Sequence, residues 1–260
     1  MRATSDNYRR PASEKTTVGN INRSALRSGG IAVIVAGLAG IAMFTLELMG
    51  PVLGFDDTDN PAVSLDYLRQ YPQFYALAAV ATFTMALAYI VASFAISDVL
   101  TPRTSSITRR SLSALGLFAA AFLFMQGVLR ESVGPLLYID SLDRGWGESA
   151  YLTIQMSGTH GFLAAGLITL AIWSVGICVA GALSRSLPIW LCVLGLVAGL
   201  RLVMLLAGPL MTAAAIDLPG IWLASMALIP LGMLWWLALG VVLLVKSRRN
   251  HEQPPVNSAQ

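Results

Sequence analysis

The chain has 260 residues, of which 56% are hydrophobic and only 12% are charged. A soluble globular domain carries about 25% charged residues, so most of this surface does not face water. The net charge of +3 is small and the basic residues lie beside apolar runs, which gives no reason to expect nucleic-acid binding. The composition predicts an all-α integral membrane protein whose main partner is the lipid bilayer.

Six stretches are apolar and long enough to cross a bilayer, for which about 20 residues are needed. In chain order the predicted spans are 31–53, 74–97, 112–134, 152–183, 188–210 and 219–245. The fourth is longer than the bilayer requires, so it is expected to tilt or to project beyond it. The polar segments outside the resulting domain of 31–245 are predicted to be disordered tails, a basic one over 1–30 and a shorter one over 246–260.

The distribution of Lys and Arg predicts the orientation, because cytoplasmic segments of membrane proteins carry an excess of both. Thirteen of the seventeen basic residues lie in the two tails and in the connections after the second and fourth spans. The opposite connections hold only Arg69 and Arg144 and are rich in Asp. Both termini are therefore expected in the cytoplasm.

Small residues recur on one face of two spans. They are Ala32, Ala36 and Gly40 in the first span and Gly116, Ala120 and Gly127 in the third. Small side chains let helix backbones approach closely, and such packing drives helix association in lipid. These faces are therefore predicted to be the contacts of a compact helix bundle.

Five ionisable residues fall within or at the ends of the spans, and all are expected in the half of the membrane away from the cytoplasm. They are Glu47, Arg130, Glu131, His160 and Arg201. At 1.5 Å per residue, Arg130 and Glu131 lie about 27 to 29 Å above Leu112, near the outer edge of a hydrocarbon core about 30 Å thick. Arg130, Glu131 and His160 are thus interpreted either as wet residues of the interface or as parts of a buried polar site.

Arg201 is the deepest of the five, about 18 Å above Ile189, with apolar residues on both sides. A charge at this depth costs several kcal/mol unless it finds a partner. Glu47 is the nearest carboxylate in depth and Glu131 is the second candidate. The hypothesis from the sequence is that Arg201 pairs with Glu47 in the interior of the bundle.

Helical phase suggests that polar side chains converge. Glu47 follows the small residues of the first span, and Glu131 is expected on the small-residue face of the third. Thr153, Ser157 and His160 are spaced by four and three residues, which gives the fourth span a polar stripe. Two interpretations remain open, a cavity open to the outside and a set of structural networks without a cavity.

The residues give weak evidence for chemistry. Glu47, Glu131 and His160 lie on different helices without a fixed spacing, and no HExxH, P-loop, GxGxxG or nucleophile-elbow motif is present. His160 is the single His within the spans, so no metal site and no cofactor are expected. Cys178 and Cys192 lie in apolar runs and are interpreted as buried small hydrophobic residues.

The region 160–208 has a His-Gly pair in the fourth span, a short basic link "SRSLP" and a Gly-rich fifth span. With the basic segment "INRSALRSGG" before the first span, this pattern resembles uncharacterised bacterial six-span integral membrane proteins of the domain-of-unknown-function kind. The resemblance implies a six-span topology and a multi-pass location in a bacterial inner membrane. It implies no catalytic residue.

Three functions are compatible with the sequence. The first is a protein that binds or moves a small hydrophobic or amphipathic molecule through an outward-facing polar pocket. The second is an intramembrane enzyme in which a buried carboxyl acts as general acid on a lipid-like or terpenoid substrate. The third is an accessory subunit that packs against a partner protein in the membrane.

Overall fold

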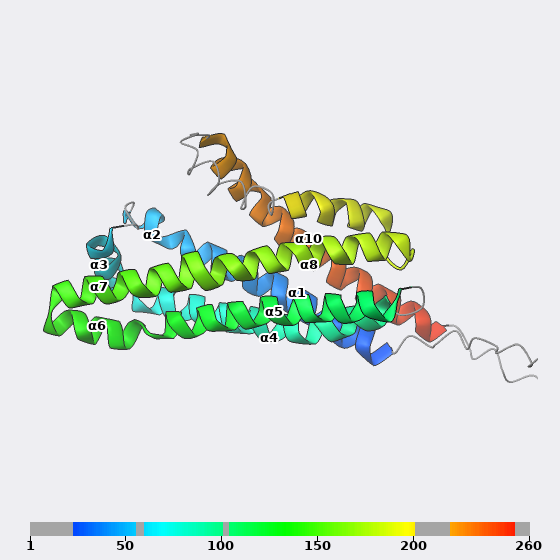
Figure 1. Ribbon diagram of the computed structural model, residues 1–260, viewed down its shortest axis with the longest axis horizontal. Helices are drawn as coiled ribbons and strands as arrows, with labels where there is room; N and C mark the ends of the chain where they lie inside the picture. Colours follow the sequence, from blue (N-terminus) through cyan, green and yellow to red (C-terminus); the bar gives the residue numbers. More distant parts are fainter. Residues whose placement is uncertain (1–22, 56–59, 101–103, 201–218, 253–260) are drawn as a thin grey trace, which may run out of the picture.

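The protein is a bundle of long helices, as predicted. The computed structural model describes residues 23–55, 60–100, 104–200 and 219–252, and every regular element within them is helical. Five helical stretches in these residues are long and apolar enough to cross a membrane. Figure 1 shows them lying side by side in an elongated bundle.

The bundle is built from α1 (Arg23–Glu47), α4 (Pro72–Val99), α5 (Ser106–Glu131), α8 (Ala164–Leu183) and α10 (Pro219–Glu252). α1 packs along α4 and α10, while α5 packs along α4 and α8. A further apolar helix covers Ile189–Leu200. It is the first part of the predicted span 188–210, the rest of which lies outside the described residues.

The helices extend further into the predicted tails than expected. α1 begins at Arg23 and α10 continues to Glu252, so parts of the segments 1–30 and 246–260 are helical. Packing explains the extension, since a Cβ at Gly29 would lie only 2.3 Å from Cβ of Ala95. Residues 1–22 and 253–260 lie outside the described part of the chain.

The small-residue faces are buried, as predicted. This holds for Ala32, Ala36 and Gly40 of α1 and for Gly116, Ala120 and Gly127 of α5. A Cβ at Gly116 would meet Ser93 Oγ at 2.1 Å and the Trp173 ring at 2.8 Å. Glycine is therefore required at this position for α5 to approach α4 and α8.

Two prolines end two of the long helices. α1 ends at Glu47 and α5 ends at Glu131, in each case four residues before a proline, Pro51 or Pro135. A proline ring clashes with the carbonyl four residues earlier and supplies no N–H to it. The chain continues after each break as a short helix, α2 (Met49–Val52) or α6 (Val133–Leu142).

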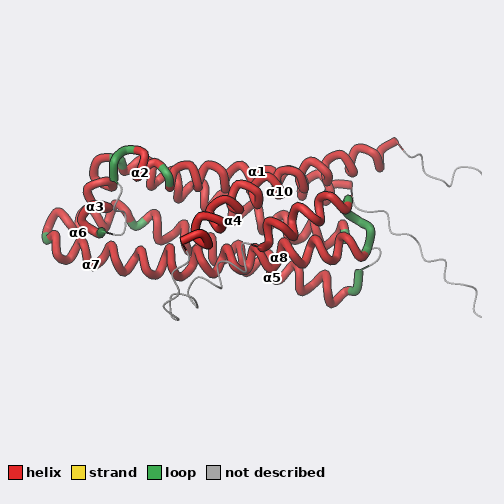
Figure 2. Tube along the Cα trace, turned by 90° about the horizontal axis from the view of Figure 1, so that it is seen from above, coloured by secondary structure: helices red, strands yellow, loops and turns green. Residues whose placement is uncertain are grey.

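Three short helices form a layer at one end of the bundle, which we call the cap. They are α3 (Pro61–Gln70), α6 and α7 (Arg144–Gln155), and they lie at the left in Figures 1 and 2. Their common core consists of Leu65, Leu68, Val133, Leu136 and Tyr151. Sequence reasoning treated these segments as connections, although Asn60 and Asp143 cap the first turns of α3 and α7.

Ion pairs hold the cap together. Arg69 pairs with the fully buried carboxylate of Asp140 and, at 3.4 Å, with Asp66. Arg144 pairs with Asp66 at 3.3 Å and with Glu148 at 3.4 Å. The two basic residues predicted outside the cytoplasm thus both bind carboxylates within the cap.

The stretch Arg144–Leu183 is helical throughout and contains a π-helical segment, η1 (Met156–Leu163), between α7 and α8. Its 40 residues span about 60 Å at the rise of an α-helix, twice the thickness of the hydrocarbon core. This length agrees with the prediction that the fourth span tilts or projects beyond the bilayer.

The helix ends with basic residues gather at the end of the bundle opposite the cap. α1 and α5 begin there, and α4, α8 and α10 end there (Figure 1). A hydrogen bond of 3.3 Å from Ser247 Oγ to the carbonyl of Arg23 joins the two outer ends of the described chain. We call this end of the bundle the basic end; its Lys and Arg residues are Arg23, Arg27, Arg109, Arg110, Arg185, Lys246, Arg248 and Arg249.

Candidate functional site

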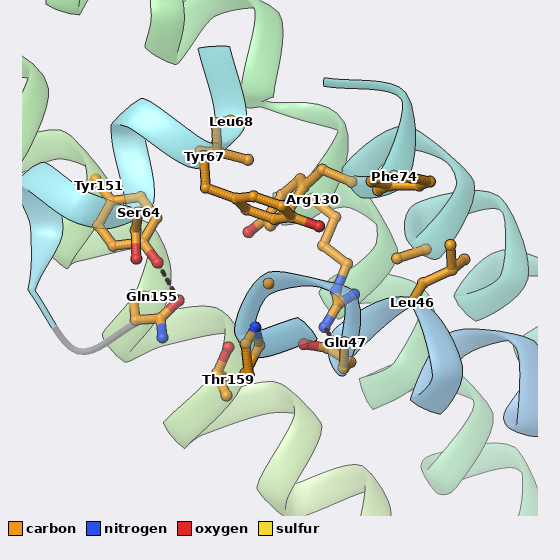
Figure 3. A pocket seen from close by; sticks show the side chains of 14 residues that line it. Leu46, Glu47, Ser64, Tyr67, Leu68, Phe74, Arg130, Tyr151, Gln155 and Thr159 are labelled. Carbon is orange, nitrogen blue, oxygen red and sulfur yellow. Dashed lines mark hydrogen bonds and ion pairs between the residues drawn. The ribbon is translucent and has the colours of Figure 1, made fainter. Parts of the chain in front are cut away.

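A pocket lies between the bundle and the cap, where α1 and α5 end. The space open to the centres of water molecules is about 150 Å³. One water needs only about 10–15 Å³ by this measure, so the pocket has room for a small polar group of several atoms. Its polar lining consists of Glu47, Ser64, Tyr67, Tyr75, Arg130, Tyr151, Gln155 and Thr159, most of which are labelled in Figure 3.

Arg130 is the central residue of the pocket. It is only 4% exposed, so the interpretation of this residue as wet is wrong. Its Nη2 donates to the carboxylate of Glu47, and its guanidinium lies 5.7 Å from the centroid of the Tyr75 ring. With its amide oriented to satisfy both neighbours, Gln126 accepts from Arg130 Nε at 3.1 Å. Helices α1, α4 and α5 thus each contribute to the surroundings of one buried cation.

Glu47 is placed in the pocket by the break that Pro51 causes. As the last residue of α1, it reaches across to the last turn of α5, and Figure 3 shows the two side chains meeting. Its side chain is 43% exposed, so it forms the open side of the ion pair. Within the described residues, its second carboxylate oxygen has no hydrogen-bond donor.

Tyr67 brings a hydroxyl from the cap to the pocket. This hydroxyl is buried and has no hydrogen-bond partner within the described residues. Burial raises the pKa of Tyr67, and the charge of Glu47 and the neighbouring Tyr71 raise it further. Tyr67 therefore keeps its proton at neutral pH and remains a hydrogen-bond donor.

The π-helical segment closes one side of the site. In the orientation given above, the amide nitrogen of Gln126 donates to the carbonyl of Gly158 at 2.6 Å. A Cβ at Gly158 would lie 2.7 Å from the Gln126 side chain, so a larger residue would displace this contact. π-Helical segments occur often at functional sites, and this one links α7 and α8 to Arg130 through Gln126.

The structure brings together two of the five candidate residues from the sequence, Glu47 and Arg130. Arg201 lies outside the described residues, so its predicted pairing with Glu47 stays a prediction. The partner that the structure gives to Glu47 is Arg130. The backbone of His160 lies in η1, and its side chain is outside the described part.

Glu131 is exposed and does not line the pocket, contrary to its predicted place on the small-residue face of the third span. The reason is helical phase. At 100° per residue, Arg130 lies about 20° from the mean direction of the other buried residues of α5, and Glu131 lies about 80° from it. Each step of four residues turns a side chain by about 40° around the helix axis, so the series of Gly116, Ala120, Gly127 and Glu131 has drifted by about 60° at its last member.

The polar stripe of the fourth span is also displaced. Thr153 and Ser157 are exposed and lie outside the pocket lining. The residues of this stretch that line the pocket are Tyr151, Gln155 and Thr159, four residues apart. Tyr151 donates to the Gln155 side chain at 3.2 Å, so these two residues are joined within the pocket wall.

Sequence reasoning missed the tyrosines and Gln126. One available signal was the sequence E-x-x-G-P, which follows both Leu46 and Arg130 and marks where two helices end at the same level. A second was the cluster Tyr67, Tyr71, Phe74 and Tyr75, because aromatic residues concentrate at membrane interfaces. Neither signal identifies which side chains meet.

Within the described residues, no group of three or more His, Cys, Asp and Glu side chains is placed to hold a metal ion. No family model, no curated protein and no solved structure matches the chain. The resemblance to bacterial six-span membrane proteins therefore stays a prediction. A proposal about function has to rest on the residues of the pocket.

Replacement of Glu47 tests whether the ion pair supports the fold. We expect Glu47→Gln to reduce the free energy of unfolding by about 2–3 kcal/mol, because it leaves a buried guanidinium without its carboxylate. The matched control is Glu131→Gln, an exposed residue at the same type of helix break, which should change it by less than about 0.5 kcal/mol. Thermal unfolding of both variants in detergent measures the two changes in stability. Equal changes would contradict a supporting role of the Glu47–Arg130 ion pair in the fold.

Proposed function

We propose that the protein is an integral membrane protein that binds or moves a small amphipathic molecule in the pocket beneath the cap. The observation that carries the proposal is the buried Arg130 in a pocket that also has an apolar wall of Leu46, Leu68 and Phe74. Membrane proteins seldom bury a charge unless it serves function. The pocket offers both a charged group and apolar surface to a ligand.

The position of the pocket supports an amphipathic ligand. Arg130 lies near the predicted outer edge of the hydrocarbon, and the cap covers it from the side of the water. Large apolar side chains nearby, among them Leu48, Val52 and Leu77, are exposed in the isolated protein. A molecule with a polar head and an apolar tail has contacts for both parts at this level.

The enzyme alternative has less support. It requires a carboxyl free to act as an acid, whereas Glu47 is paired with Arg130 and Glu131 lies outside the pocket. Nothing observed favours an accessory role over binding of a small molecule. We therefore propose ligand binding rather than catalysis.

We further propose six spans with both termini in the cytoplasm, and a bacterial inner membrane as the location. The gathering of basic residues at the basic end, with Asp66, Asp140 and Glu148 in the cap, supports this orientation by the positive-inside rule. The helix Ile189–Leu200 supports a span between α8 and α10. The resemblance described above supports the choice of membrane.

Cysteine labelling tests the orientation. Ser141 in the cap and Ser106 near the basic end are both exposed, while the native Cys178 and Cys192 are 0% and 1% exposed. We expect a membrane-impermeant maleimide to label Ser141→Cys in intact spheroplasts and to label Ser106→Cys only after permeabilisation. The reverse pattern would place the cap in the cytoplasm.

A ligand screen with a blocked pocket tests the function. Dodecyl amphiphiles with anionic, cationic, zwitterionic and neutral heads are added to the full chain in nonionic detergent. At about a hundred times its Kd, a bound amphiphile should raise Tm by about 5–10 °C, because it stabilises only the folded state.

A matched pair of variants locates the binding. Thr159→Phe fills the pocket and should abolish the rise in Tm, whereas Thr153→Phe, on the exposed side of the same helical stretch, should keep it. If no amphiphile raises Tm, or if the rise is the same in Thr159→Phe, the pocket does not have the proposed function.

A further inference from the structure

The pocket carries one positive and one negative charge. Glu47 and Arg130 are the charged residues among the described side chains that line it, so the charge of the lining sums to zero. Both belong to the same ion pair, and each has one polar atom that the ion pair does not use. Within the described residues, Nη1 of Arg130 and the second oxygen of Glu47 have no hydrogen-bond partner.

The polar groups that are open to a ligand differ in charge and in how deeply they are buried. Arg130 Nη1 belongs to a side chain that is 4% exposed. The Tyr67 hydroxyl is a buried donor that has no hydrogen-bond partner among the described residues. Both suit an anionic oxygen. The free oxygen of Glu47 belongs to the more exposed side chain and suits an ammonium group.

Electrostatics separates three ligand classes. An anionic head would gain from Arg130 but would be repelled by Glu47 a few ångströms away, and a cationic head would meet the opposite problem. A head with both charges places each one beside its opposite, so that two antiparallel dipoles attract. The low dielectric of a half-buried site strengthens this preference.

We propose that the pocket selects a zwitterionic head, in which a phosphate or carboxylate contacts Arg130 and Tyr67 and an ammonium contacts Glu47. This inference rests on the proposed function and names its ligand class. The shared chemistry is a phosphate or carboxylate joined to an amine by a short linker. The source is either the head group of a membrane lipid or a free solute with the same groups.

Native mass spectrometry of the wild-type full chain in a nonionic detergent tests the class directly. The probes are dioleoyl lipids with phosphoethanolamine, phosphocholine, phosphoglycerol or trimethylammonium heads, which share the same chains. We expect the two zwitterionic lipids to bind about tenfold more tightly than the anionic and cationic ones. Glycerophosphoethanolamine and glycerophosphocholine, which lack the chains, form the soluble arm.

The soluble arm distinguishes the two sources. Much weaker binding of the soluble heads than of the lipids assigns the site to a membrane lipid. Equal binding of the soluble heads and the lipids also supports the zwitterion site and assigns it to a free solute. Equal or tighter binding of the anionic or the cationic lipid overturns the inference, and this comparison needs no variant.

A charge variant gives a second, independent readout. Among the described side chains of the lining, Glu47→Gln leaves Arg130 as the one charged group, so the preference should change from zwitterionic to anionic heads. Glu131→Gln lies next to Arg130 in sequence but outside the pocket, and it should keep the wild-type order. An unchanged order of lipids in folded Glu47→Gln would also overturn the inference.

The outcomes separate this inference from the proposed function. Binding of some amphiphile that Thr159→Phe abolishes, with an anionic or cationic head preferred, retains the function and rejects the zwitterion. Failure of every amphiphile to bind rejects both.

Discussion

A guanidinium buried at the end of the bundle is the constraint on which the rest of the site depends. Arginine does not lose its proton in proteins, so Arg130 remains charged although it is 4% exposed. The protein must therefore bring acceptors to it. Glu47 of α1, Gln126 of α5 and the ring of Tyr75 of α4 provide them, and this requirement fixes three helices relative to one another.

The two ends of the bundle use different physical means. Toward the basic end, glycines such as Gly29 and Gly116 allow helices to approach so closely that even a methyl group would collide. Toward the cap, Pro51 and Pro135 end α1 and α5 at the level of the pocket. The breaks create the space that the cap covers, and the ion pairs of Arg69 keep the cap in place.

Much of the architecture was predictable because it depends on properties along one helix. Apolar length predicted the helices, and the spacing of Ala32, Ala36 and Gly40 predicted a packed face.

The partner of Glu47 was not predictable in this way. Depth along a helix can be counted from the sequence, but the direction of a side chain around the axis depends on the neighbours, on breaks such as Pro135 and on segments such as η1. α3 and α7 were missed because they are short and polar, although their capping residues Asn60 and Asp143 were visible. α6 is apolar but short, and it directly follows the third span, so it gave no separate signal.

The central claim is that Glu47 and Arg130 interact directly across the pocket. A double-mutant cycle tests it, with Glu47→Gln, Arg130→Gln and the double variant compared by thermal unfolding in detergent. The account predicts a coupling free energy of about 1–3 kcal/mol between these residues, as found for charged groups in contact. A parallel cycle between Glu47 and Arg201 tests the pairing predicted from the sequence. Coupling below about 0.5 kcal/mol for Glu47 and Arg130, together with clear coupling of Glu47 to Arg201, would contradict the account.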